Sequence, residues 1–253
     1  MVGTGTMIVM GLLAVLTAVV PLGVMLLLRR RGGRWGAFWT GVGTFFLFAL
    51  VLEAMFHQLV LGSPLGAAIR GNIWLYALYG GLAAGIFEET GRLLAFRLML
   101  RRRRERITAL AYGIGHGGGE AFLLLGVTYL SNLVLLALLQ SGAALPPEIT
   151  AALEPLAAVP VSAFLWAGFE RVGAITLHMA CSVLVFAAAA GRGRRWLFPA
   201  AVLLHFAADF VTVIAGARLP IAATELLVAL CALLAAVLAA RVYKNLEENP
   251  EMT

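Results

Sequence analysis

The chain has 253 residues, of which 62% are hydrophobic and only 13% are charged. Soluble domains carry about 25% charged residues, so this composition excludes an ordinary soluble protein and indicates a polytopic membrane protein. The net charge of +6 does not indicate nucleic-acid binding, because the arginines gather in short clusters between apolar runs. No hydrophilic block is long enough to fold separately, so we expect one integral membrane domain over residues 1–253.

Seven apolar segments follow one another along the chain, each near or above the roughly 20 residues that a transmembrane helix needs. They cover residues 7–28, 36–61, 73–100, 109–139, 161–190, 198–216 and 219–240. The sequence therefore predicts an all-α bundle of about seven membrane-spanning helices. The connection 140–160 fits either a short surface helix or an ordered loop, and we expect 247–253 to be a disordered tail.

Basic residues predict how the bundle is oriented. The connections after the first, third, fifth and seventh segments are rich in basic residues, whereas the other connections hold only Arg70 and Arg218. The basic connections contain Arg29–Arg31, Arg34, Arg101–Arg104, Arg106, Arg192, Arg194, Arg195, Arg241 and Lys244. Because cytoplasmic loops carry an excess of arginine and lysine, we expect the N-terminus outside and the C-terminus in the cytoplasm.

Ten charged or histidine side chains lie well inside the third to sixth segments, where each unpaired charge costs about 2.5–3.5 kcal/mol. They are Glu88, Glu89, Arg92, His116, Glu120, Glu170, Arg171, His178, His205 and Asp209. In the expected orientation, the glutamates of the third segment, the three histidines and their acidic neighbours lie at the membrane centre or in its cytoplasmic half. Spacings of three or four residues place these groups on shared helix faces: Glu88 or Glu89 with Arg92, His116 with Glu120, and His205 with Asp209. We therefore expect one buried site, within a catalytic core of about residues 73–216.

Two further features of the sequence lie near this predicted site. Five glycines surround His116 in the run 113–120. Their four-residue spacing indicates close helix packing, and their missing side chains would also leave room for a substrate or water. Glu53 and His57 form another i,i+4 pair, but nearer the outer surface, so we expect them to be a packing or capping pair.

The predicted site could hydrolyse a peptide bond without a metal ion. Glu88 or Glu89 would accept the proton of a water molecule, while Arg92 orients the other carboxylate. His116 or His205 would donate to the oxyanion, and the acidic residue four positions along each helix would fix the imidazole tautomer.

The same residues also allow a zinc-dependent reaction. His116, His178 and His205 would supply three ligands and leave one position for water. Glu120 and Asp209 would then orient the ligands, and a glutamate of the third segment would act as the base. The sequence has no HExxH motif, so this hypothesis depends on three dispersed histidines.

Four parts of the chain resemble the YhfC-type intramembrane proteases, which are similar to the CAAX-processing and bacteriocin-processing (CPBP) proteases and to the PrsW-type proteases. They are the run FEETGR at 87–92, the run GHGGGE at 115–120, Glu170-Arg171 with His178, and His205-xxx-Asp209. The resemblance covers the third to sixth segments. It implies a multi-pass peptidase of the bacterial plasma membrane that acts on a membrane protein or a lipid-anchored peptide, with Glu170 and Arg171 in a supporting role.

The motifs depart from those of the related families in two places. CPBP enzymes usually have three residues between the second glutamate and the arginine, where this chain has only Thr90 and Gly91. PrsW-type enzymes have the shorter spacing but end in lysine, and they have Phe-xxx-Glu in place of His116-xxx-Glu120. CPBP relatives are generally viewed as glutamate-dependent, whereas older descriptions call the family metalloproteases. The resemblance therefore leaves both chemistries open, with zinc as the cofactor of the second.

Two other functions compete with a peptidase. Buried glutamate and histidine chains also carry protons in transporters, although this sequence shows no inverted repeat. A non-catalytic membrane scaffold or immunity-type protein would need the cluster only for stability.

Overall fold

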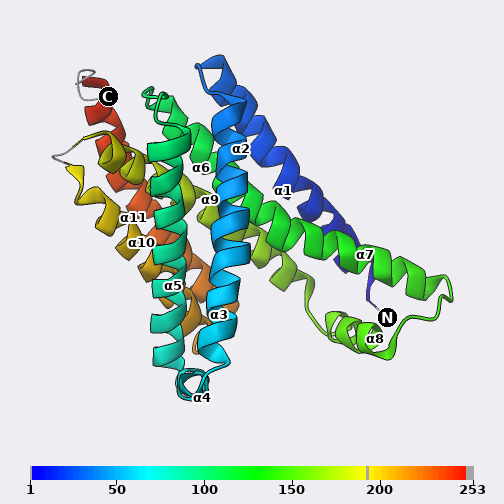
Figure 1. Cartoon of the computed structure of the whole chain (residues 1–253). Helices are drawn as coiled ribbons and strands as arrows, with labels where there is room; N and C mark the ends of the chain where they lie inside the picture. The colour runs from blue at the N-terminus through cyan, green and yellow to red at the C-terminus, as the bar shows by residue number, and fades with distance from the viewer. Residues whose placement is uncertain (1, 192–193, 249–253) are drawn as a thin grey trace.

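The structure is a computed structural model and describes residues 2–191 and 194–248. In chain order the longer helical runs are α1 (Thr4–Arg30), α2 (Trp35–Phe45) with α3 (Ala54–Leu61), α5 (Ile73–Leu94), α6 (Ile107–Glu120) with α7 (Val127–Gln140), α9 (Val161–Ala190), α10 (Leu197–Gly216) and α11 (Ile221–Glu248). The π-helical segments η1 (Phe46–Glu53), η2 (Ala95–Met99) and η3 (Ala121–Gly126) continue α2, α5 and α6. Short helices in the connections are α4 (Pro64–Gly71), α8 (Pro147–Leu153) and the 3-10 turn η4 (Glu154–Ala157). The predicted all-α class is confirmed (Figure 1).

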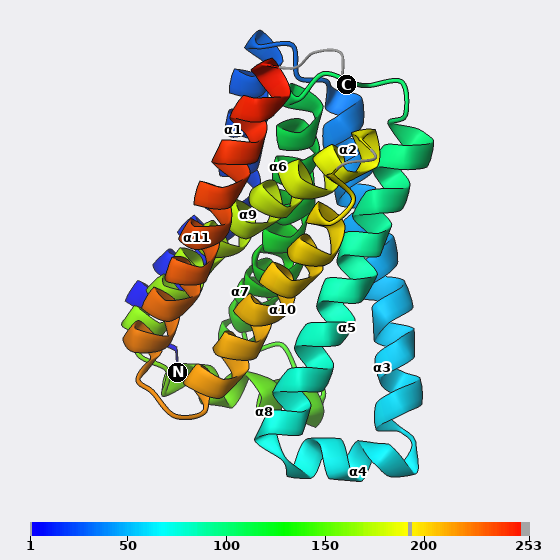
Figure 2. The same ribbon diagram turned by 90° about the vertical axis from the view of Figure 1, so that its left-hand side faces the viewer.

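The predicted transmembrane segments correspond to the long helices. Within the described residues, six helices are long and apolar enough to cross a membrane: Thr4–Arg30, Trp35–Leu61, Ile107–Gln140, Val161–Ala190, Leu197–Gly216 and Ile221–Leu246. The remaining predicted span, 73–100, forms α5 and η2, which carry the charged residues Glu88, Glu89 and Arg92 and are therefore less apolar. This helix packs along α10 (Figure 2), and the chain is a multi-pass membrane protein with about seven spans.

The helix connections alternate between two ends of the bundle, as the sequence predicted. The connections α1–α2, α5–α6 and α9–α10 and the end of α11 lie together, opposite α4, α8 and the N-terminus (Figures 1 and 2). We call the first group the basic end, because it carries Arg29–Arg31, Arg34, Arg101–Arg104, Arg106, Arg194, Arg195, Arg241 and Lys244. Arg192 lies outside the described residues. That the basic end faces the cytoplasm remains a prediction.

Glycines of α6 allow the helices of the core to approach closely. A Cβ on Gly115 would overlap the carbonyl oxygen of Phe38 in α2, and one on Gly117 would lie 2.9 Å from the Cα of Ile175 in α9. Gly113 likewise faces α9, and Gly119 faces α2. The two glycine pairs therefore serve two different neighbours. This confirms the packing interpretation, and α2 and α9 fill the space that the sequence left open for a substrate or water.

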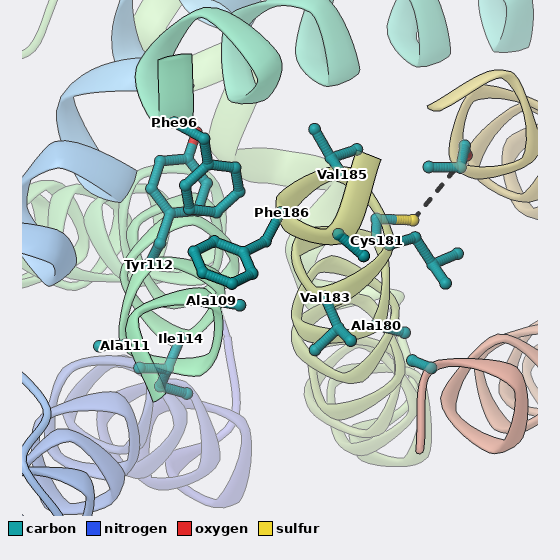
Figure 3. Close-up of a cluster of buried hydrophobic side chains, with 14 of the residues drawn as sticks. Phe96, Ala109, Ala111, Tyr112, Ile114, Ala180, Cys181, Val183, Val185 and Phe186 are labelled. Carbon is teal, nitrogen blue, oxygen red and sulfur yellow. Dashed lines mark hydrogen bonds between the residues drawn. The ribbon is translucent and has the colours of Figure 1, made fainter. Parts of the chain in front are cut away.

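The main apolar cluster extends from α1 and α2 through α6 and α9 to α10 and α11, and its aromatic part lies between α6, α9 and η2. Phe96, Tyr112 and Phe186 pack together there, with ring centroids 4.7 Å apart for Phe96–Tyr112 and 5.4 Å apart for Phe96–Phe186 (Figure 3). Tyr112 is fully buried, and Phe96 and Phe186 are nearly so. The aromatic group fixes the distance between α5, which continues into η2, and α9.

The connections differ from the sequence predictions in detail. Part of the segment 140–160 is helical as α8 and η4, which settles the choice that the sequence left open. α4, which begins at Pro64, was not predicted. Glu247 and Glu248, assigned to the expected disordered tail, belong to α11, and residues 249–253 lie outside the described residues.

Candidate functional site

Polar side chains from α5, α6, α9 and α10 meet inside the bundle. The group consists of the ten residues that the sequence singled out: Glu88, Glu89, Arg92, His116, Glu120, Glu170, Arg171, His178, His205 and Asp209. Glu89, Arg92 and His116 have no exposed surface, and each of the ten lies within 4.0 Å of an oppositely charged or histidine partner in the group. The prediction that these residues form one cluster is therefore confirmed, whereas their roles remain to be argued.

Glu88 lies among the three histidines of the cluster. Its Oε2 is 2.8 Å from Nε2 of His116 and 3.9 Å from Nδ1 of His178, and its Oε1 is 3.9 Å from Nε2 of His205. His116 also approaches the Tyr112 hydroxyl, 3.5 Å from its Nδ1. The Glu88 side chain retains 9% of its exposure, so it is buried but reaches the cavity described below.

Glu89 points to different partners, as expected for a residue about 100° further around the helix. Its Oε2 is 2.9 Å from Nε of Arg92, and its Oε1 is 2.9 Å from Nδ1 of His205. Arg92 in turn donates to the carbonyl oxygen of His178 at 2.7 Å and to the hydroxyl of Ser182. Arg92 therefore ties α5 to α9, and Glu89 ties α5 to α10.

The hydrogen bonds of Arg92 fix the tautomer of His178. Nη2 of Arg92 lies 3.0 Å from Nδ1 of His178, and a guanidinium group can only donate. Nδ1 must therefore accept, which places the ring proton on Nε2, 2.5 Å from Oε2 of Glu120. Both ring nitrogens of His178 are thus engaged.

Glu120 links this histidine to a second arginine. Nη1 of Arg171 donates to Oε1 of Glu120 at 2.7 Å, and its Nε donates to Glu170 at 2.7 Å. The side chain of Arg171 is 16% exposed, so this ion pair lies nearer the surface than the one between Glu89 and Arg92. Glu170 and Arg171 therefore form the outer edge of the cluster.

A cavity of about 250 Å³ opens beside the cluster, among α5, α6, α9, α10 and α11. Its polar lining consists of Glu88, Glu120, Glu170, Arg171, His178, His205, Asp209 and Thr212. Glu89, Arg92 and His116 do not line it and lie behind this wall. α11 contributes Val228 and Ala232, although the sequence assigned the seventh segment no part in the site.

The pairing of side chains differs from the sequence prediction in one respect. Glu120 pairs with His178 on α9 and not with His116 on its own helix. The physical reason is that a side chain can pair either with a group on its own helix face or with a group on a facing helix. For Glu120 the partner on the facing helix α9 is the closer one. For Arg92 the sequence left two partners open, and the structure pairs it with Glu89. The predicted pair of His205 and Asp209 is present but long, since Oδ2 of Asp209 is 3.6 Å from Nε2 of His205.

Sequence reasoning did not find Ser182 and Tyr112. Ser182 is fully buried and accepts from Arg92, while its own hydroxyl donates to the carbonyl oxygen of His178 at 2.6 Å. A hydroxyl group in an apolar segment does not indicate a functional site, because a serine can donate its hydrogen bond to a carbonyl oxygen of its own helix. The spacing from His178 to Ser182, again four residues, was the signal available.

Glu53 and His57 pair with each other, as predicted, and neither lines the cavity of the cluster. Glu53 is buried, and its Oε1 is 3.1 Å from Nε2 of His57. Nδ1 of His57 is 2.7 Å from the hydroxyl of Tyr79 on α5. The pair therefore joins the second span to the third.

The cluster has the residue types of a metal site, and one of its contacts opposes a zinc ion at Nδ1 of His178. Two groups have donor atoms within 4.8 Å of one another: Glu88, His116 and His178, and Glu89, His178 and His205. Neither is the predicted set of three histidines, and both need His178. The guanidinium of Arg92 lies 3.0 Å from Nδ1 of His178, so a cation at this nitrogen would displace or directly face another cation. Nε2 of His205, by contrast, faces the cavity with its charged neighbours at 3.6 and 3.9 Å.

Comparisons with known proteins agree with the resemblance seen in the motifs. A family model described as YhfC intramembrane metalloprotease matches residues 16–232, which includes the whole cluster. The chain belongs to the YhfC family. It is 34% identical over 248 residues to the membrane protein YhfC of Bacillus subtilis (strain 168), covering 92% of this chain and 95% of that protein. No solved structure matches.

Membership of the YhfC family places the cluster in the context of intramembrane proteolysis. The family description names a metal-dependent protease, whereas the contacts of His178 in this chain commit both of its ring nitrogens to protein partners.

Proposed function

We propose that this YhfC-family protein is an intramembrane peptidase of the bacterial plasma membrane. It hydrolyses a peptide bond of a membrane-associated protein or lipid-anchored peptide at a site open toward the cytoplasm. The observation that carries the proposal is the position of Glu88, a carboxylate at the wall of a cavity and among three imidazoles. A structural ion pair would need neither the cavity nor the additional histidines.

Glu88 is the general base of the proposed reaction. It faces the cavity, whereas Glu89 is held behind the wall by Arg92. Glu88 accepts a proton from a water molecule as the water oxygen adds to the substrate carbonyl, and it then gives this proton to the leaving amine as the C–N bond breaks. His116, which contacts Glu88 at 2.8 Å but not the cavity, is a positioning residue.

His205 polarises the substrate carbonyl. Its Nδ1–H donates to Glu89, which fixes the ring so that Nε2 points to the cavity. With a proton on both nitrogens the ring donates Nε2–H to the oxyanion that forms as water adds. Asp209, 3.6 Å from Nε2, lines the same wall and balances the charge of the ring.

Proton exchange within the cluster supports this chemistry. Five carboxylates face two guanidinium groups, so the cluster approaches neutrality by holding protons on its histidines and carboxylates. Groups that share protons at a dry site serve as acid and base in turn. Glu89, Glu120, Arg92 and Arg171 keep these groups in place, and Glu170 holds the outer arginine.

A comparison of membrane proteomes tests the proposal. The wild-type protein and its Glu88→Gln variant would be produced in a bacterium that lacks its own relative, and new protein termini in the membrane fraction would be identified by mass spectrometry. We expect termini that depend on Glu88, and unchanged cleavage with the matched variant Glu53→Gln, which alters a buried glutamate outside the cavity. Identical termini with and without Glu88, together with proton flux in liposomes, would instead support a transporter.

A further inference from the structure

A second cavity, of about 170 Å³, lies at the basic end of the bundle, beside Phe96 and Phe186 of the aromatic group. It is formed by η2, the loop that follows it and the last turns of α9. Its lining includes Arg97, Arg101, Arg103 and Arg104, and its floor includes Phe96 and Phe186. The proposed peptidase activity makes no use of this cavity.

The charge of this cavity is positive. Arg97, Arg101 and Arg103 line it together with Arg104, and no acidic residue does among the described residues. The end of α9, which reaches the cavity at Ala189 and Ala190, brings only about half a negative charge from the helix dipole. Arginines gathered around a small hollow match a phosphate group, whose oxygens accept paired N–H bonds from guanidinium.

The surroundings of the cavity indicate that the phosphate belongs to a lipid. Leu98 and Met99, in the same π-helical segment as Arg97, are 66% and 69% exposed, and in a membrane protein such side chains face the acyl chains. Arginines and a lipid-facing apolar strip thus lie side by side at one end of a spanning helix. This arrangement matches a lipid with an anionic headgroup and apolar chains.

We propose that this cavity binds the headgroup of an anionic glycerophospholipid. The phosphate lies among the four arginines, and the glycerol and acyl chains run down the outer face of η2 past Leu98 and Met99. The binding does not depend on the peptidase activity.

A lipid bound in the cavity is connected to the catalytic cluster by the packing of the aromatic group. Phe96 and Phe186 line the cavity, and Phe96 packs on Tyr112 (Figure 3). The hydroxyl of Tyr112 is in turn 3.5 Å from Nδ1 of His116. A headgroup that bridges η2 and the end of α9 would hold together the helices that carry Glu88 and His178. The bound lipid therefore stabilises the fold at the place where the cluster is built.

Thermal unfolding in detergent micelles, titrated with lipid, tests the proposal. Phosphatidylglycerol, with one negative charge, should raise the Tm, and zwitterionic phosphatidylcholine should raise it far less. The variant Arg97→Gln/Arg101→Gln should lower the apparent affinity for phosphatidylglycerol by about tenfold or more. The matched control Arg29→Gln/Arg31→Gln removes two charges from the same end, outside the cavity, and should change it less than about twofold.

Native mass spectrometry of the same proteins should show phosphatidylglycerol retained by the wild type and the control but lost from the cavity variant. Arg101→Gln/Arg103→Gln serves as a second variant if the first does not fold. Equal responses to the two lipids, or equal losses in the cavity and control variants, would overturn the proposal. Inorganic phosphate that reproduces the Tm shift and displaces the lipid would show that the ligand is a soluble phosphate and would also overturn it.

Discussion

The most informative perturbation of the cluster is Arg92→Met, because Arg92 ties α5 to α9 and also holds Glu89, which contacts His205 on α10. The guanidinium has no exposed surface and contacts Glu89, the carbonyl oxygen of His178, its Nδ1 and Ser182. Its removal leaves the Glu89 carboxylate without its arginine in the interior. Breaking a buried ion pair in this way costs about 3–5 kcal/mol, and the lost bonds to α9 add to the cost.

For a chain of this length, this cost corresponds to a fall in Tm of roughly 6–20 °C. The assay is thermal unfolding of the purified protein in a constant detergent and lipid. The double variant Glu89→Gln/Arg92→Met should recover part of the loss, because it removes the stranded charge. Arg171→Met is the control, since its ion pair is 16% exposed and its loss should cost less.

Two results would refute this reasoning. A fall in Tm of less than about 2 °C for Arg92→Met would show that the ion pair does not support the fold. A double variant no more stable than the single one would show that the loss comes from packing and not from the unpaired carboxylate.

Three further predictions follow from the packing and from the site. Gly115→Ala should destabilise the protein by about 1–3 kcal/mol, since its Cβ would overlap Phe38, whereas Gly80→Ala, which has free space around it, should be neutral or slightly stabilising in thermal unfolding. Zinc analysis of purified, active protein should give far less than one ion per chain, and chelation should leave cleavage intact; stoichiometric zinc with activity lost on chelation would contradict the account. His205→Gln, which can still donate a hydrogen bond, should retain more activity than His205→Ala in a cleavage assay, and equal losses would argue against oxyanion stabilisation by this side chain.

The sequence was sufficient to predict the spans and the membership of the cluster. Lipid excludes unpaired charges and long polar stretches, so composition alone marked the helices and the ionisable residues that had to face inward. Depth could be read from position because each helix crosses the membrane once. Helical spacing also predicted correctly that Glu88 and Glu89 would have different partners.

The partners across helices could not be predicted, because the rotation of each helix about its axis depends on packing. Gly115 and Gly117 set how α6 faces α2 and α9, and this turns Glu120 toward His178. The sequence could not distinguish Glu88 from Glu89 as the base either, because only the structure shows that Glu88 lines the cavity and Glu89 does not. The sequence also could not show that Arg92 opposes a zinc ion at His178, because only the structure places the guanidinium 3.0 Å from Nδ1 of that histidine.

Hydrolysis of a purified membrane substrate in ¹⁸O-labelled water tests the central claim most directly. A single-span peptide that carries a cleavage site found in cells would be reconstituted with wild-type protein, with Glu88→Gln or with Glu53→Gln. The account predicts that the wild type and Glu53→Gln release a product with one ¹⁸O in its new carboxyl group, and that Glu88→Gln lowers the rate by about 100-fold or more. Cleavage by Glu88→Gln at the wild-type rate would contradict it.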